Sequence, residues 1–484
     1  MKGILVNMNQ NIPLISLLNG KSGKYLYDTN TNTILKVENE VFDKLKEVIK
    51  IGYIDFLKKN NPNDLVIKTI VRMYSEGFLR SSYIEQLEHP VSDYINDYLD
   101  NGINGLILQV TQNCNLKCRY CSFACDETFL NRDHSKKTMK FEIAKKTLDF
   151  LKEHSKNTKS ISIGFYGGEP LIEIKLIEEC IEYAKKIFFD KIITFNITSN
   201  GTIMNNKILQ VLKENNVVLM ISLDGPRAIH NINRRYFING KGSFDKVIEN
   251  LLFIKKNEYE YFKTIKYNSV VELDNNNIED VVNFFSSNEV TRDNDYQLTL
   301  VADNFININY SETNEFLCSK ETYIFKNFIN YLCGKSFSYD FSYLENLKSL
   351  SQTISFEKEL PKQYHNYGPC IPGYLRLHVD VDGIFRPCEK VSEKSDEMII
   401  GNINDGFNYD NIYRLLNYGS TKRLNCKNCW AIRLCQMCCN NFDYHGEDKE
   451  AYFEEKCLME KRNIKEAIEC LLILRECGVN LKDE

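Results

Sequence analysis

The cysteines of this chain gather in two places where their spacing could hold a metal site. Cys114, Cys118 and Cys121 follow one another closely, directly after the apolar run at 106–111. A second group lies near the other end of the chain: Cys370, Cys388, Cys426, Cys429, Cys435, Cys438, Cys439 and Cys457. The opening residues have no export signal, so we expect a cytoplasmic protein, in which clustered cysteines bind metals or carry out redox chemistry rather than form disulfides.

Three cysteines on one short loop are one ligand short of the usual metal sites. A structural zinc ion takes four ligands, and its cysteines usually come as CxxC pairs. A [4Fe–4S] cluster also takes four thiolates. A cluster held by Cys114, Cys118 and Cys121 would therefore keep one iron open for a ligand from outside the protein. Three unrelated thiols, or an incomplete zinc site, are the alternative.

The CxxxCxxC spacing, with the aromatic Tyr120 before the last cysteine, resembles the signature of the radical SAM superfamily. The resemblance implies that the open iron binds the amino and carboxylate groups of S-adenosylmethionine (SAM). It further implies that one electron from the cluster cleaves SAM, and that the resulting 5′-deoxyadenosyl radical removes a hydrogen atom from the substrate. Tyr120 is then a candidate to line the cofactor site.

Small and polar residues after later apolar runs resemble the SAM contacts of this superfamily: Gly167, Gly168, Glu169, Ser199, Asn200, Ser222 and Arg234. By resemblance, the Gly-Gly-Glu segment holds the methionine ammonium group, and glycines let a backbone approach a ligand closely. The Ser-Asn pair would offer polar groups to the ribose. Arg234 is suited to pairing with the SAM carboxylate. A plain turn at the glycines and a surface salt bridge at Arg234 are the alternatives.

The second cysteine group resembles the SPASM extension of radical SAM enzymes. The resemblance implies two auxiliary [4Fe–4S] clusters, one on Cys426, Cys429, Cys435 and Cys457 and the other on Cys370, Cys388 and Cys439. Together with the SAM-binding cluster this makes three. Two zinc sites are the alternative for this region.

The cluster at Cys370, Cys388 and Cys439 lacks an evident fourth ligand. A cysteine of the substrate could fill the position, or Cys438, His365 or Glu389 could close it locally. Glu389 also resembles the acidic residue that accepts a proton in anaerobic sulfatase-maturing enzymes. An ordinary exposed carboxylate is the alternative.

The elements that must position these residues alternate between strands and helices. Short apolar runs begin near residues 106, 160, 193, 217, 264 and 296, with amphipathic segments such as 139–154 between them. Such alternation predicts a parallel sheet with right-handed crossovers. Six units predict an α/β fold with a partial (β/α)6 barrel, as the resemblance also implies. In barrels of this kind, functional residues lie at the C-terminal strand ends, where the first cysteine group is expected.

We expect four domains in chain order. Residues 1–95 contain a hairpin over 24–37 and two helical segments, and resemble the winged-helix-like domain that binds precursor leader peptides along a strand edge. The partial barrel is expected over 96–310 and a helical bridge over 311–365. Residues 366–484 would be the SPASM domain, with a hairpin at 379–389 and a helix from about residue 459.

The resemblance implies a peptide maturase that forms thioether crosslinks in a cysteine-rich precursor peptide with a leader, of the sactipeptide or ranthipeptide type. An electron donor such as flavodoxin or ferredoxin is the second expected partner. A net charge of −5 and the lack of a long apolar stretch favour neither nucleic acid nor membrane as a partner. Formylglycine formation or carbon–carbon crosslinking is the enzymatic alternative. A non-catalytic Fe–S or zinc module that binds peptides is the alternative from another class.

Overall fold

A computed structural model describes most of the chain, and its described ranges are 11–121, 135–271, 278–300, 341–366, 368, 370–420, 425–444, 449–479 and 481. The chain divides into two compact units, each assembled from segments that are distant in the sequence. One unit contains residues 1–93, 341–369 and 416–484, and the other contains 94–340 and 370–415. We call them the terminal unit and the barrel unit. No helix within the described ranges combines the length and the apolar character needed to cross a membrane.

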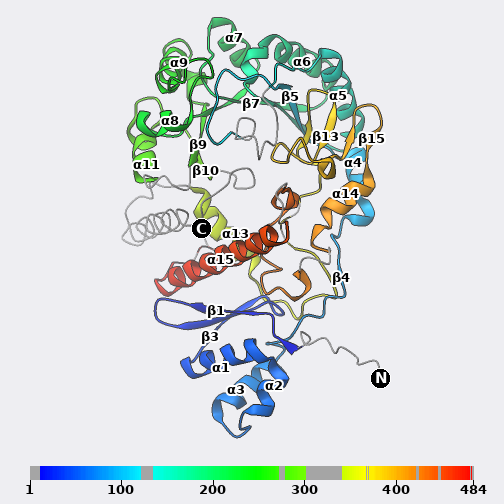
Figure 1. The fold of residues 1–484 in the computed structure, drawn as a ribbon, viewed down its shortest axis with the longest axis vertical. Helices are drawn as coiled ribbons and strands as arrows, with labels where there is room; N and C mark the ends of the chain where they lie inside the picture. The colour runs from blue at the N-terminus through cyan, green and yellow to red at the C-terminus, as the bar shows by residue number, and fades with distance from the viewer. Residues whose placement is uncertain are drawn as a thin grey trace. The chain divides into compact units, whose positions relative to one another are not determined.

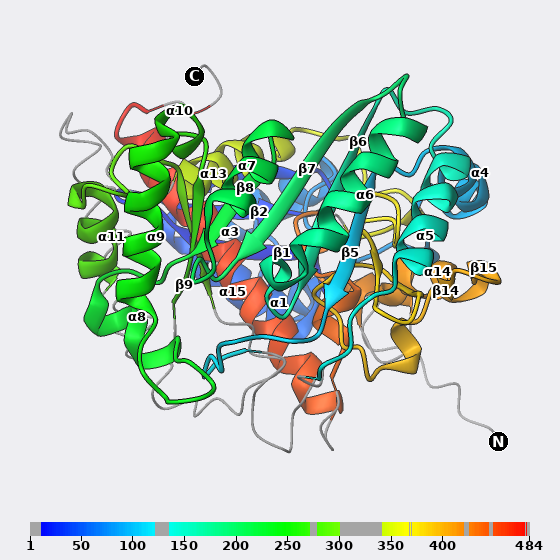
Figure 2. The ribbon, with the colours of Figure 1, turned by 90° about the horizontal axis from the view of Figure 1, so that it is seen from above.

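The barrel unit contains six neighbouring parallel strands in chain order. They are β5 (Gly105–Thr111), β6 (Ser160–Gly167), β7 (Ile192–Ser199), β8 (Val218–Ser222), β9 (Lys266–Val271) and β10 (Tyr296–Leu300). The connecting helices include α5 (Phe141–His154), α6 (Ile174–Ile187), α7 (Asn206–Glu214), α8 (Arg227–Asn233), α9 (Phe244–Asn257) and α11 (Ile278–Ser287). Figures 1 and 2 show α5, α6, α7 and α9 on the outer side of the strands. The partial α/β barrel expected from the sequence is confirmed.

Side chains alternate along these strands as the sequence pattern requires. In β6, Ile161, Ile163 and Phe165 are buried, while the residues between them are partly exposed. Alternate residues of a strand point to opposite faces, so the apolar set packs under the helices and the other set lines the concave face.

Four short strands extend this sheet beyond β5. They are β12 (Leu377–Val379), β13 (Ile384–Arg386), β14 (Gly401–Asn402) and β15 (Gly406–Phe407). β12 runs parallel to β5, and the next three strands continue in antiparallel order. The hairpin predicted at 379–389 is confirmed, and the structure adds that it belongs to the barrel sheet.

The terminal unit contains a three-stranded antiparallel sheet between two layers of helices. The strands are β1 (Ile15–Asn19), β2 (Lys24–Asp28) and β3 (Thr33–Val37), and the helices are α1 (Asn39–Ile51), α2 (Tyr53–Lys59), α3 (Leu65–Ser75) and α15 (Lys449–Glu476). Figure 1 shows α15 on one side of the sheet and α1 to α3 on the other. The predicted hairpin β2–β3 is confirmed, whereas β1 and α2 were not expected from the sequence.

Two expectations for the C-terminal half need correction. Helix α15 begins at Lys449 rather than near residue 459, because residues 449–458 are mostly strong helix formers. Within the described part of the expected helical bridge, only α13 (Phe341–Thr353) is helical. Residues 354–362 form neither helix nor strand, and β11 (Gln363–Tyr364) pairs with β4 (Gln86–Leu87). Residues 301–340 lie outside the described residues.

The junction between β5 and the added strands leaves no room for a side chain at Gly105. A Cβ atom there would lie 1.8 Å from the carbonyl oxygen of Leu375, whereas at Gly164 the nearest atom would be 3.5 Å away. We expect Gly105→Ala to cost about 1–3 kcal/mol of stability, because the backbone must shift to admit a methyl group. Thermal unfolding followed by circular dichroism should show a midpoint lowered by at least about 2 °C. Gly164→Ala is the matched control, and equal midpoints for the two variants would contradict this account.

Candidate functional site

The loop that follows β5 carries Cys114, Cys118 and Cys121 and brings the three thiols near one another. The amide of Leu116 donates to Sγ of Cys114 at 3.4 Å, and the amide of Cys121 donates to the carbonyl of Cys118 at 3.1 Å. Burial raises the pKa of the Cys114 thiol to about 12, and the negative charges of Glu169 and Cys121 add to the rise. Burial also raises the pKa of Cys118, with smaller contributions from the other two cysteines.

The glycine pair at the end of β6 holds this loop by its backbone. The amide of Gly168 donates to the carbonyl of Thr111, and that of Glu169 to the carbonyl of Asn113, both at 2.9 Å. A Cβ atom on Gly168 would lie 2.2 Å from the Asn113 carbonyl oxygen, and Gly167 has a φ of 145°. Glycine is therefore required for β6 to approach the cysteine loop this closely. Direct contact of these glycines with SAM stays a prediction.

Glu169 is fully buried and connects the end of β6 to the loop after β7. Its carboxylate accepts hydrogen bonds from the Leu171 amide at 3.0 Å, the Ser199 hydroxyl at 2.9 Å and the Asn200 amide at 2.7 Å. Burial raises the pKa of Glu169, and these donors oppose the rise. The observed role of Glu169 is to fix the Ser199–Asn200 segment, and its expected contact with the methionine ammonium group stays a prediction.

Asn200 lies directly against the cysteine loop. Its Nδ2 donates to Oδ1 of Asn115 at 2.8 Å and lies 3.8 Å from Sγ of Cys114. Asn115 in turn donates to the Thr202 hydroxyl at 2.8 Å. Sequence reasoning missed Asn115 and Thr202. Their positions, directly after the first cysteine and two residues after Asn200, are the only sequence signal that points to them.

A buried ion pair connects the cysteine loop to the loop after β8. Nε of Arg234 donates to Oδ2 of Asp224 at 2.9 Å, and their side chains are 7% and 0% exposed. The hydroxyl of Tyr120 donates to the same carboxylate, and the Arg234 guanidinium lies 5.4 Å from the centre of the Tyr120 ring. The other oxygen of Asp224 accepts from the Val270 amide at 3.0 Å.

A surface salt bridge is therefore the wrong description of Arg234. Burial alone would lower its pKa, but the electrostatic interactions with Asp224 and, to a lesser extent, Tyr120 outweigh burial and raise the pKa above the usual value. Asp224 was missed from the sequence, although it lies two residues beyond Ser222, the last residue of β8. Ser222 itself is buried. The contacts of Ser222 and Arg234 with SAM stay predictions.

Glu389 is mostly buried rather than an ordinary exposed carboxylate. Its Oε1 pairs with Nη1 of Arg376 at 2.9 Å, and its side chain is 13% exposed. Sequence reasoning missed Arg376. The expected role of Glu389 as a proton acceptor stays a prediction.

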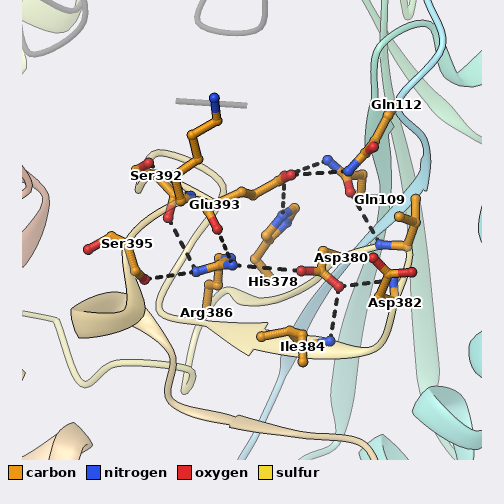
Figure 3. Close-up of polar contacts among 12 residues, drawn as sticks. Gln109, Gln112, His378, Asp380, Asp382, Ile384, Arg386, Ser392, Glu393 and Ser395 are labelled. Atoms are coloured by element: carbon orange, nitrogen blue, oxygen red, sulfur yellow. Dashed lines mark hydrogen bonds and ion pairs between the residues drawn. The ribbon is translucent and has the colours of Figure 1, made fainter. Parts of the chain in front are cut away.

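A second buried polar network ties the segment after Cys388 to β5 (Figure 3). The carboxylate of Glu393 accepts from the side-chain amides of Gln109 and Gln112, the latter at 3.3 Å, and Nε2 of His378 lies 3.8 Å away. Arg386 donates to the Glu393 carbonyl at 2.6 Å and to the Ser392 and Ser395 carbonyls at 3.2 Å. Gln112 precedes Cys114 by two residues, so this network links the two cysteine-bearing segments of the barrel unit.

Four cysteines of the terminal unit lie near one another: Cys426, Cys429, Cys435 and Cys457. That they hold one cluster stays a prediction. Burial, with smaller contributions from Cys429 and Cys457, raises the pKa of Cys426 to about 12. The pKa of Cys435 is also raised by burial, with contributions from Cys429 and Cys426. Lys461, one helical turn after Cys457, opposes the rise at three of these thiols and was missed from the sequence.

The three remaining predicted ligands belong to different units. Cys370 is exposed and Cys388 is partly buried in the barrel unit, whereas Cys439 is buried in the terminal unit. Their grouping around one cluster stays a prediction.

Two of the donor sets fit iron–sulfur clusters in their chemistry, since they consist of partly buried thiols that lie near one another: Cys114, Cys118 and Cys121, and Cys426, Cys429, Cys435 and Cys457. In the described part of the chain, no three His, Cys, Asp or Glu side chains converge closely enough to hold one metal ion. The cysteines around an iron–sulfur cluster bind different irons, so they need not converge on one point.

We expect the Asp224–Arg234 pair to be needed for the fold of the cysteine loop. Asp224→Asn would leave Arg234 buried without a counter-charge, at a cost of about 3–5 kcal/mol. Thermal unfolding and hydrogen exchange of residues 112–121 measure the effect. Asp245→Asn is the matched control, because Asp245 pairs with Arg227 on the surface, where such pairs contribute about 0–1 kcal/mol. Equal effects of the two substitutions would show that the buried pair does not hold the loop.

Comparison with known proteins finds a family match for part of the barrel unit. Residues 108–285 match the model of the radical SAM superfamily. The chain is 25% identical to the radical SAM cyclopropyl synthase TigE of Paramaledivibacter caminithermalis over 295 residues, which are 53% of this chain and 57% of TigE. It is 33% identical to the cysteine-type anaerobic sulfatase-maturating enzyme of Clostridium novyi over 161 residues, 32% of this chain and 41% of that enzyme. The chain thus spans about half the length of these curated relatives.

Solved structures show a similar fold. The sulfatase-maturating enzyme anSMEcpe with bound AdoMet has a TM-score of 0.53 at 22% identity, covering 75% of this chain and 99% of that one. The same enzyme with AdoMet and the Cp18Cys peptide has a TM-score of 0.52 at 23% identity. The likeness covers the mixed α/β partial barrel. The chain therefore carries a radical SAM region at residues 108–285 and is related in sequence to TigE and to anaerobic sulfatase-maturating enzymes.

Proposed function

We propose that this protein is a radical SAM enzyme that forms thioether crosslinks in a ribosomally made, cysteine-rich precursor peptide. The observation that carries the proposal is the cysteine loop after β5, fastened by residues from the ends of β6, β7 and β8. Superfamily membership of residues 108–285 supports a SAM-dependent reaction. The cysteine group of the terminal unit supports an oxidative one.

Cys114, Cys118 and Cys121 would hold a [4Fe–4S] cluster with SAM on its open iron. When bound, this pair of cofactors supplies the removal of a hydrogen atom from an unactivated carbon. The loops that carry Gly168, Asn200 and Arg234 would surround SAM. Their buried contacts keep these loops in one arrangement, which is what positioning a reactive cofactor requires.

The other cysteines would serve the oxidation. Joining a thiol sulfur to carbon removes two hydrogens from the peptide, so a second electron must leave the substrate. Cys426, Cys429, Cys435 and Cys457 would hold one auxiliary cluster, and Cys370, Cys388 and Cys439 another. Glu389, buried beside Arg376, would accept a proton. A flavodoxin or ferredoxin would supply the electron that starts the reaction.

A peptide substrate is supported by the relatives. Structures of anSMEcpe hold the Cp18Cys or Kp18Cys peptide, and TigE is described as a cyclopropyl synthase. The leader of the precursor would bind along β3, whose residues are partly or fully exposed and which pairs only with β2 among the described strands. An extended peptide can add to such an edge by backbone hydrogen bonds.

Formylglycine formation is the second candidate, favoured by the 33% identity to a sulfatase-maturating enzyme. The structural match covers 99% of anSMEcpe but only 75% of this chain, so about a quarter of the chain has no counterpart there. The unmatched quarter of the chain favours an additional function that the relative does not need, such as recognition of a leader peptide.

Changing Cys114, Cys118 and Cys121 together to Ala should remove roughly a third of the bound iron, since three clusters hold about twelve irons. Cleavage of SAM should stop, because no open iron remains to bind it. Iron content and the yield of 5′-deoxyadenosine measure the two effects. Cys477→Ala is the control, since Cys477 belongs to neither cysteine group. A triple variant that still cleaves SAM would refute the assignment.

Binding of a leader peptide should slow hydrogen exchange in Thr33–Val37. The reason is that backbone amides at a strand edge become hydrogen-bonded when another strand is added. The measurement uses the full-length protein and synthetic leader segments of cysteine-rich precursor peptides, with scrambled leaders as control. Protection confined to other segments would place the recognition site elsewhere.

A further inference from the structure

The segment 28–32, which contains the last residue of β2 and the turn to β3, is buried although all its residues are polar. Asp28, Thr29, Asn30, Thr31 and Asn32 are at most 5% exposed. Connecting segments normally run over the surface, because their backbone polar groups need partners that water supplies. A buried polar turn therefore requires protein partners for its polar groups.

The terminal unit supplies those partners. The carboxylate of Asp28 accepts from the amides of Thr31 and Leu79, both at 2.8 Å. Asn30 accepts from the amide of Leu360 at 3.0 Å, and Asn32 donates to the carbonyl of Thr353 at 2.8 Å. The polar groups of the turn thus have specific hydrogen-bond partners in the terminal unit.

Arg433 binds this turn from the cysteine-rich segment, where it lies between Cys429 and Cys435. Its Nε donates to the carbonyl of Thr29 at 2.6 Å, and Nη2 donates to that of Asn30 at 3.2 Å. Nη1 pairs with Glu357 at 2.7 Å, and the Arg433 side chain is 2% exposed. A planar guanidinium can serve several acceptors at once, which a lysine cannot do.

The residue after Cys429 contacts the same sheet. The hydroxyl of Thr29 donates to the carbonyl of Trp430 at 2.5 Å. The rings of Tyr27 and Trp430 are 6.3 Å apart in an edge-on arrangement. Leu18 and Tyr27 share one apolar core with residues of the cysteine segment and of α15, and Cys429, Trp430 and Cys435 pack against that core.

We infer that the buried turn 28–32 and Arg433 position Cys429 and Cys435, so that the N-terminal sheet is part of the protein shell around this cysteine group. Apart from a single helical turn at Cys426–Asn428, the segment from Cys426 to Cys435 has little regular structure of its own. Local turns hold parts of this segment, such as the hydrogen bonds from Ile432 to Cys429 and from Cys435 to Ala431, and the tertiary contacts hold these turns relative to one another. The inference rests on the proposed function where it takes these cysteines as cluster ligands.

Linkage between iron binding and the sheet follows from this arrangement. A ligand that binds only the folded form of a site stabilises everything that must fold to make the site. Iron bound by Cys426, Cys429, Cys435 and Cys457 should therefore slow the opening of β2 and β3. By reciprocity, loosening the turn should weaken iron binding at these cysteines.

Thr29→Val and Arg433→Gln test the inference in the full-length protein. Thr29→Val removes one hydrogen bond at nearly constant shape, and Thr69→Val is its control on the exposed side of α3. Arg72→Gln controls for Arg433→Gln, since Arg72 is 78% exposed. Hydrogen exchange of residues 425–437 should become about tenfold faster in the two test variants and stay unchanged in the controls. Trp430, the only tryptophan, should shift its emission to longer wavelength as water reaches it.

The linkage gives a readout that a loss of packing alone would not produce. In the wild type, removing iron with a chelator should speed exchange of residues 24–37, and in Arg433→Gln this response should disappear. Unchanged exchange of 425–437 in both test variants, or equal acceleration in β6 and β7, would overturn the inference. Iron content tests the proposed function separately from this inference. If the double variant Cys426→Ser and Cys429→Ser loses no iron, the assignment of these cysteines to a cluster is wrong. The comparison of hydrogen exchange still decides whether the turn and Arg433 position the cysteines.

Discussion

The site depends on how an irregular loop with three thiols is held in one shape. Residues 112–121, the described part of the loop that carries the cysteines, have almost no regular structure, so their conformation comes from contacts with neighbouring strand ends. β6 contributes the backbone approach at Gly168, β7 contributes Asn200, and β8 contributes the buried Asp224–Arg234 pair. Parallel strands bring all these ends to the same edge of the sheet. A partial barrel of parallel strands can therefore hold the cysteine loop from several sides.

Much of this architecture could be predicted from the sequence because it is local. The strands β5 to β10 and the helices between them follow from apolar periodicity, and the cysteine groups follow from spacing. Asp224, Asn115 and Arg376 could not be predicted, because a single polar residue after a strand carries no sign of its distant partner. The pairing of β12 with β5 and the short strands β14 and β15 could not be predicted for a related reason: two- and three-residue strands are defined by their pairing and not by a sequence pattern.

Sequence patterns indicate domains that are continuous in the chain better than they indicate distant segments that pack around one core. The expected order was four consecutive domains, whereas the described structure groups residues 1–93 with 341–369 and 416–484. The polar turn at residues 28–32 is the weak sequence signal for this grouping. A turn made entirely of Asp, Thr and Asn looks like solvent-exposed chain, and its burial requires a donor such as Arg433 that only the folded structure identifies.

The position of that turn bears on how the protein is made. Thr29 and Arg433 are 404 residues apart, so the turn after β2 is synthesised long before the arginine that binds it. At about 5–20 residues per second, the delay is on the order of tens of seconds. During that time the barrel strands can pair among themselves, since the six parallel strands are complete by Leu300. Translation that stops before the cysteine-rich segment would thus release a chain in which the buried turn of the N-terminal sheet lacks its binding partners. Chaperones and proteases would act on such a chain.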